Sequence, residues 1–138
     1  MSIAPTHNPY QDTSVLSSSP ERLVQILYEH LVVNLKRAEM FIHKGDIEGK
    51  FECLARASDI VSELLAALDH EAGGEFAERL ASLYAFWLSE ISTAGRELNT
   101  ARIQRVIGMV SSLLEAWEEA ARKLAPESGN GAMMGETA

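Results

Sequence analysis

Few side chains in this sequence could carry out chemistry, and the best pair of them falls on one predicted helix. Glu39 and His43 are four residues apart, so a helix places their carboxylate and imidazole on one face. Such a pair could be part of a metal site, but a di-iron centre in a helical bundle needs two Glu-x-x-His pairs and two further glutamates. The sequence has no such ligand set, and we expect the protein to hold no metal and no other cofactor.

Two further features could belong to an enzyme but fit one poorly. His70 and Glu71 lack the second histidine of a zinc-protease helix, and Gly73-Gly74 follows no predicted strand, as a phosphate-binding loop would. Cys53 lies among apolar neighbours, where an unpaired cysteine usually packs as a small core residue and does not act as a nucleophile. The sequence therefore predicts a protein that is not an enzyme.

The composition is that of a soluble, single-domain protein with one hydrophobic core. Of the 138 residues, 46% are hydrophobic and 23% are charged, and the apolar runs are far shorter than the roughly 18 residues of a membrane-spanning helix. The net charge of −8 would repel nucleic-acid phosphates. The start of the sequence has no basic segment followed by an apolar one, as a secretory signal would. We therefore expect a cytoplasmic protein with no membrane insertion and no nucleic-acid partner.

Helix-capping residues and apolar periodicity predict two helices in the first half of the chain. The first begins near Ser19 and ends at Gly45, a natural left-handed terminator. Asp46 then caps the second helix, which ends near Asp69.

Two more helices are predicted in the second half. Gly73-Gly74 breaks the chain within a linker over residues 70–75, and the helical period resumes at Phe76. Asn99 or Thr100 caps the last helix, and Pro126 ends it.

Four amphipathic helices joined by short loops can bury their apolar stripes only against one another. The sequence therefore predicts an all-α protein, an antiparallel four-helix bundle over residues 19–125. Residues 1–18 have no helical period and are predicted to form an N-terminal arm. Residues 126–138 are predicted to form a disordered C-terminal tail.

The second predicted helix carries more apolar surface than a bundle position needs. Its main stripe begins at Ile47 and ends at Leu68, and a second stripe beside it contains Ile60 and Leu64. Together the two stripes cover about half of the helix circumference. Either the N-terminal arm or a slightly splayed bundle covers this surplus, or Ile60 and Leu64 flank a groove that accepts an amphipathic helix or an extended apolar segment of a partner.

The first predicted helix has a similar surplus. Ile26, Val33 and Met40 recur at strict seven-residue spacing, away from the main apolar stripe of that helix. This stripe is a second candidate for partner contact. It also allows a different interpretation, in which the protein is a non-catalytic adaptor that pairs this stripe with its own copy. The sequence leaves open whether the protein is a monomer or a weak homodimer.

Several motifs, in order along the chain, resemble the flagellin export chaperones of the FliS family. Tyr10 followed by Ser14-Val15 and Ser19-Pro20 is similar to the opening of that family. Residues 68–75 resemble its junction between the second and third helices, and Leu113-Leu114-Glu115-Ala116-Trp117 resembles its closing motif. The resemblance covers about residues 8–124.

The sequence also departs from the family pattern, mainly on the third predicted helix. The family usually has an acidic residue where Ala85 and Arg105 stand, and basic residues near Ser89 and Glu90. It usually has Ala-Asn where Ala94-Gly95 occurs. These departures bear on surface contacts and not on the fold.

The resemblance implies a cytosolic chaperone that binds the C-terminal segment of flagellin, prevents its premature polymerisation and supports its export by the flagellar type III apparatus. Components of that apparatus are a further expected class of partner. The resemblance also implies that the N-terminal segment packs near the client site, so Tyr10 either completes that site or caps the end of the bundle. The candidate client contacts are Tyr10, Val15, Ile60, Leu64, Ile26, Val33 and Met40.

Overall fold

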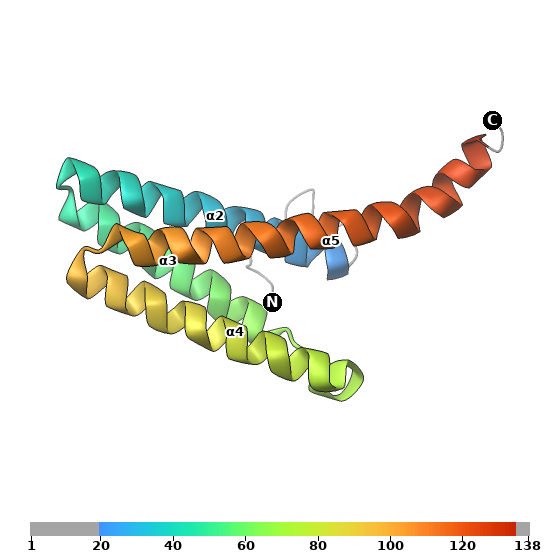
Figure 1. The fold of residues 1–138 in the computed structure, drawn as a ribbon, viewed down its shortest axis with the longest axis horizontal. Helices are drawn as coiled ribbons and strands as arrows, with labels where there is room; N and C mark the ends of the chain where they lie inside the picture. Colours follow the sequence, from blue (N-terminus) through green and yellow to red (C-terminus); the bar gives the residue numbers. More distant parts are fainter. Residues whose placement is uncertain (1–19, 135–138) are drawn as a thin grey trace, which may run out of the picture. The chain divides into compact units, whose positions relative to one another are not determined.

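The computed structural model describes the backbone of residues 20–134 and the side chains of residues 20–123. Within these residues all regular structure is α-helical, which confirms the predicted fold class (Figure 1). The predicted N-terminal arm, residues 1–18, lies outside the described residues. The helices are α2 (Pro20–Lys44), α3 (Ile47–Ala66), α4 (His70–Glu97) and α5 (Thr100–Met134).

The turn between α2 and α3 follows the predicted capping chemistry. Gly45 has a φ of 76°, a left-handed conformation that glycine adopts without strain. Asp46 is the N-cap of α3, and its carboxylate accepts a hydrogen bond of 2.9 Å from the backbone N–H of Gly49. Both predicted boundaries are therefore confirmed.

The turn between α3 and α4 differs from the prediction. The carboxylate of Asp69 accepts a hydrogen bond of 3.1 Å from the backbone N–H of Ala72, so α4 begins at His70 and not at Phe76. The predicted glycine break lies inside α4, where Gly74 has φ 53° and ψ −127° and interrupts the helical backbone. The N-cap at Asp69 therefore stabilises one helical turn before Gly74, where the sequence predicts a linker.

The end of α5 also differs from the prediction. The helix continues past Pro126 to Met134, whereas the sequence predicts that Pro126 ends it. Proline has a helical φ, but it lacks an N–H and its ring crowds the carbonyl four residues earlier, so it can bend a helix without ending it.

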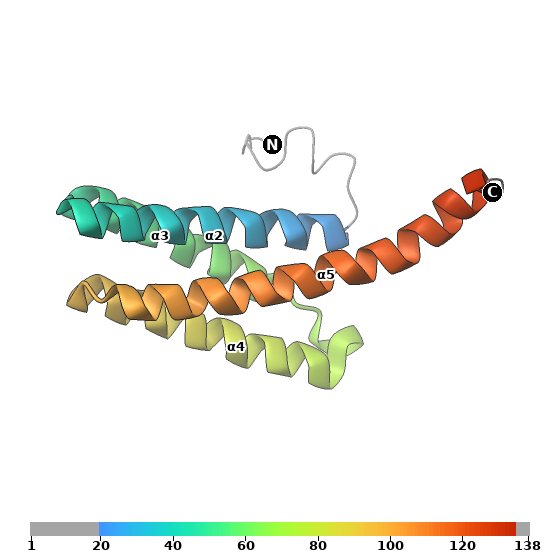
Figure 2. The ribbon, with the colours of Figure 1, turned by 45° about the horizontal axis from the view of Figure 1, so that its top comes forward.

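The described residues belong to two compact units. The larger unit is Leu27–Ser111, and the described part of the smaller unit is residues 20–26 and 112–134. In the larger unit the segments of α2, α3, α4 and α5 lie side by side, with short turns between successive helices (Figure 2). In the smaller unit the indole N–H of Trp117 donates a hydrogen bond of 3.1 Å to the backbone carbonyl of Glu21.

The core of the larger unit contains buried side chains from all four helices. Trp87 is fully buried, with its ring centre 5.3 Å from that of Tyr84 and 6.3 Å from that of Tyr28. Aromatic and aliphatic side chains of this size give a core its main stabilisation by leaving water. Cys53 belongs to the same core, as predicted. The other buried residues include Leu31, Leu35, Ala57, Ile60, Val61, Leu64, Ile91, Ile103, Val106 and Val110.

Candidate functional site

Among residues 20–123, no group of three or more histidine, cysteine, aspartate or glutamate side chains is placed to hold a metal ion. Cys53 is a free, buried thiol, and its burial raises its pKa, which keeps the thiol protonated at neutral pH.

In the described part of the chain, no helix has the length and apolar character to cross a membrane.

Several large apolar side chains of the described residues stay exposed after the core has formed. Phe51 on α3 has 55% of its surface exposed, and Ile47, which is also exposed, lies one helical turn before it. Isolated exposed apolar residues are common, but neighbouring ones mark a surface that a partner can cover. The full set is Val33, Met40, Ile47, Phe51, Phe76, Phe86 and Leu98.

A groove between α3 and α4 adjoins Phe51, and we call it the α3–α4 groove. It has a volume of about 330 Å³. Leu54 and Ile91 are buried and form its floor, whereas Phe51 and Arg96 are exposed on its walls. A mostly apolar concave surface of this size suits one or two side chains of a partner. The lining residues are Phe51, Leu54, Ala55, Ser58, Ile91, Ser92, Gly95 and Arg96.

Small residues line part of this groove, and Gly95 is the one without a side chain. A Cβ atom at Gly95 would lie 3.4 Å from Cδ1 of Leu54 and 4.0 Å from Cε1 of Phe51. These are ordinary van der Waals distances. The missing side chain at Gly95 therefore leaves space directly over the floor and wall of the α3–α4 groove.

Lys50 holds the two walls of the groove in place. It is buried, and its ammonium donates a hydrogen bond of 2.9 Å to the backbone carbonyl of Gly95. That carbonyl lies in the last turn of α4, where carbonyls lack helical partners and a cation is favourable. The same ammonium lies 3.8 Å from the ring centre of Phe51, within cation–π range. One side chain thus links the end of α4 to the exposed ring on α3.

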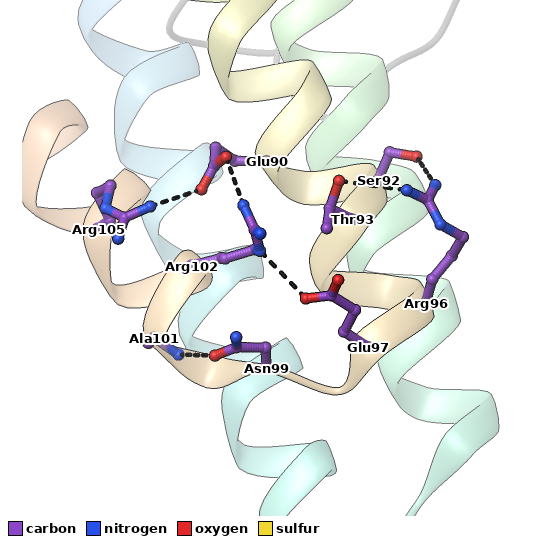
Figure 3. A network of polar contacts seen from close by, with 9 residues as sticks. All are labelled: Glu90, Ser92, Thr93, Arg96, Glu97, Asn99, Ala101, Arg102 and Arg105. Atoms are coloured by element: carbon purple, nitrogen blue, oxygen red, sulfur yellow. Dashed lines mark hydrogen bonds and ion pairs between the residues drawn. The ribbon is translucent and has the colours of Figure 1, made fainter.

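Arg96 supplies a positive charge at the groove wall. Its guanidinium donates hydrogen bonds to the hydroxyl oxygens of Ser92 at 3.0 Å and Thr93 at 3.3 Å (Figure 3). Within residues 20–123, no carboxylate forms an ion pair with it. The charge of Arg96 is therefore held in place by hydroxyl groups and stays available to an acidic group.

A second polar cluster joins α4 to α5. The buried carboxylate of Glu90 accepts hydrogen bonds from Arg102 at 2.9 Å and from Arg105 at 3.0 Å (Figure 3). Arg102 also contacts Glu97 at 3.3 Å. One buried carboxylate and two arginines therefore join α4 to α5 in this cluster.

On α3, the structure buries the second apolar stripe and leaves the start of the main stripe exposed, whereas Leu54 and Val61 of the main stripe are buried. Ile60 and Leu64, predicted to flank a partner groove, are each only 2% exposed and belong to the core. Ile47 and Phe51, predicted to lie on the core face, are exposed. Both stripes are similarly apolar, so periodicity does not decide which of their residues stay exposed. Contact of Ile60 or Leu64 with a client would require the bundle to open, and it stays a prediction.

On α2, the seven-residue stripe is not one continuous surface. Val33 and Met40 are 47% and 42% exposed, but Ile26 is only 5% exposed. All four residues from 25 to 28 are buried, so helical periodicity does not decide burial in this segment. Only Val33 and Met40 of this stripe are therefore exposed and available for a homodimer interface. Tyr10 and Val15 lie outside the described residues.

Phe51, Gly95 and Arg96 are not among the site residues predicted from the sequence. The α3–α4 groove depends on the rotation of α3 and on the approach of residues about 45 positions apart, such as Lys50 and Gly95. The one local signal is Gly95 itself, a glycine in the last turn of α4.

Comparison with known proteins gives a consistent match. The family model described as flagellar protein FliS matches residues 2–124. The chain is 37% identical over 113 residues to the flagellar secretion chaperone FliS of Campylobacter jejuni, covering 82% of this chain and 88% of the relative. It is 34% identical over 113 residues to the protein of the same name from Salmonella typhimurium, covering 81% and 84%. The Bacillus subtilis protein of that name is 27% identical over 120 residues, covering 87% and 89%.

Proposed function

Because the chain belongs to the FliS family, we propose that it is a cytoplasmic chaperone that binds the C-terminal segment of flagellin. In this role it keeps flagellin from polymerising early and supports its delivery to the flagellar type III export apparatus. The role is one of binding, with no catalysed reaction. The family match over residues 2–124 is the observation that carries the proposal.

The exposed apolar surface of the larger unit supports this role. A segment that is disordered when alone loses conformational entropy on binding, and it must bury apolar area to offset that loss. The α3–α4 groove and the exposed ring of Phe51 supply such area without disturbing the core. We therefore propose that the client covers this groove.

The other candidate contacts fit the proposal to different degrees. Val33 and Met40 are exposed and can extend the client surface onto α2. Tyr10 and Val15 stay predictions from the family resemblance. Direct contact through Ile60 or Leu64 is the least compatible with the folded bundle, because both are core residues.

The proposal is tested by calorimetric titration of the full chain with a peptide that spans the C-terminal segment of flagellin from the same bacterium. We expect saturable binding with a negative heat-capacity change, because apolar surface is buried on both partners. Flagellin that lacks this segment is the matched control and is expected not to bind. Equal binding of intact and truncated flagellin, or no binding of either, would show that the proposed client segment is wrong.

A second measurement tests the consequence for assembly. The full chain, added in excess over flagellin monomers, is expected to slow the growth of filaments from short flagellin seeds. Flagellin that grows at an unchanged rate while bound to the chain would contradict the proposed protection.

A further inference from the structure

Gly95 is a helical glycine that the fold of the free protein does not require. Glycine is a poorer helix former than alanine, so it usually has a structural reason. Positive φ values occur at Gly45 and Gly74 but not at Gly95. A Cβ at Gly95 would make only ordinary contacts, the nearest at 3.4 Å. Neither backbone strain nor lack of room within the protein explains this glycine.

The other close-packed helical glycines differ in this respect. A Cβ at Gly49 would lie 2.7 Å from the ring of Phe41, and one at Gly73 would lie 2.8 Å from Cβ of Ala77. Something would have to move at either position. At Gly95 nothing has to move, and Gly95 is the one of these three that lines the α3–α4 groove.

We propose that Gly95 determines which client side chain the α3–α4 groove accepts. The inference rests on the proposed chaperone function and deepens it. The space over Gly95 receives one large apolar side chain of the client, which packs on Leu54 and Ile91 and covers the exposed ring of Phe51. Arg96 at the wall pairs with a carboxylate of the client close to that side chain. The groove therefore recognises an apolar anchor next to an acidic residue.

The charges around the groove argue for the acidic neighbour. The protein has a net charge of −8, yet the α3–α4 groove has a guanidinium on its wall and the ammonium of Lys50 beside it. The Lys50 ammonium already contacts the carbonyl of Gly95 and the ring of Phe51. Arg96 is oriented by the hydroxyls of Ser92 and Thr93 and has no carboxylate partner among the described side chains. A charge of this kind is complementary to an acidic client residue.

The steric part is tested with the variants Gly95→Ala and Gly108→Ala in the full chain. Gly108 is also a helical glycine, but a Cβ there would meet nothing within 4 Å, and it does not line the groove. Both variants are expected to resist urea as well as the wild type or better, because alanine favours a helix. Only Gly95→Ala is expected to bind the flagellin C-terminal peptide more weakly, by roughly tenfold or more, the scale of one methylene in an apolar pocket.

The outcomes of these measurements separate the two proposals. If the wild type does not bind the peptide, the proposed function fails. If the wild type binds and folded Gly95→Ala binds equally well, the role of Gly95 is overturned and the proposed function stands. Equal weakening in both variants, or loss of the folded state in Gly95→Ala, would also overturn it, because the glycine would then act through the fold.

The charge part is tested with Arg96→Gln, with Arg56→Gln as the matched control. Arg56 is exposed on α3 and does not line the groove. We expect Arg96→Gln to weaken peptide binding several-fold at low salt and the difference from wild type to shrink at high salt, because salt screens exposed charges. Arg56→Gln is expected to bind like the wild type. Equal effects of the two substitutions would overturn the specific role of Arg96.

Discussion

The phenol oxygens of Tyr28 and Tyr84 lie 2.7 Å apart in the core of the larger unit, where a hydrogen bond joins α2 to α4. Both side chains are buried, and this burial raises the pKa of each phenol above its ordinary value. In a neutral pair one hydroxyl donates a hydrogen bond to the oxygen of the other, whereas a buried phenolate would lose its hydration. The core therefore depends on both tyrosines staying protonated.

This dependence predicts that the protein loses stability at alkaline pH. In the unfolded chain a tyrosine ionises near its ordinary pKa of about 10, whereas in the folded chain ionisation is shifted to higher pH. Above about pH 10 the unfolded state thus binds fewer protons, and the free energy of unfolding falls as pH rises towards the folded pKa values. Urea unfolding followed by circular dichroism at pH 8, 9, 10 and 11 measures this slope.

The variant Tyr84→Phe provides the control for that experiment. It removes one titrating group and one hydrogen bond, so we expect a loss of about 1 kcal/mol at pH 8. It should also show a shallower decline above pH 10. A variant with the wild-type slope would mean that other groups cause the alkaline loss.

Cys53 is predicted to react with alkylating reagents only when the bundle unfolds. Its thiol is buried, and the burial raises its pKa, so access and thiolate are both limited in the folded chain. Iodoacetamide at pH 8, with mass spectrometry as the readout, should label the protein slowly in buffer and fully above the urea midpoint. Rapid labelling of the native protein would place Cys53 at an accessible surface.

The carboxylate of Glu90 is predicted to stabilise the junction of α4 and α5. It is buried and accepts from both Arg102 and Arg105, and a charge-assisted hydrogen bond contributes more than a neutral one, about 1.5–3 kcal/mol. The arginines are more exposed and can recover water, so we expect Glu90→Gln to lower the free energy of unfolding by roughly 1–2 kcal/mol.

A surface ion pair gives the matched comparison for Glu90. Glu75 contacts Arg79 at 3.0 Å, and both side chains are largely exposed. Glu75→Gln should therefore change the free energy of unfolding by at most about 0.5 kcal/mol. If both substitutions have the same small effect in urea unfolding, the cluster around Glu90 does not stabilise the junction.

Two positions on α3 are predicted to separate folding from client binding. Ile60→Asp places a charge in the core, which should cost several kcal/mol and abolish the cooperative thermal transition. Phe51→Ala removes an exposed ring, so it should keep the transition but weaken binding of the flagellin C-terminal peptide. Thermal melts and titrations of both variants provide the measurement. A folded Ile60→Asp variant would contradict the burial of Ile60 in the core.

Local chemistry allowed some features of the fold to be predicted from the sequence. Gly45 and Asp46 act through their own backbone conformation and a bond to a residue three positions away, so their roles are visible in the sequence. Asp69 favours the start of a helix, whereas Gly74 favours a break. The structure contains both, a cap at Asp69 and a kink at Gly74. The glycine pair alone predicts a break, whereas the cap at Asp69 allows one helical turn before it.

The candidate site was less predictable, because contacts distant in sequence define it. The rotation of α3 places Phe51 outside and Ile60 inside, and two equally apolar stripes do not reveal that rotation. The hydrogen bond between Lys50 and the carbonyl of Gly95 links two helices and has no sequence signature. The groove follows from these contacts and not from the period of any one helix.

The two tryptophans of the chain provide a separate optical signal for each compact unit. Trp87 is fully buried in the larger unit, and Trp117 is half-buried in the smaller one, where it donates to Glu21. The indole emission of Trp87 should therefore be at shorter wavelength and should shift to the red only when the larger unit unfolds. In a Trp87→Phe variant the remaining fluorescence comes from Trp117 alone and follows the smaller unit without any added dye.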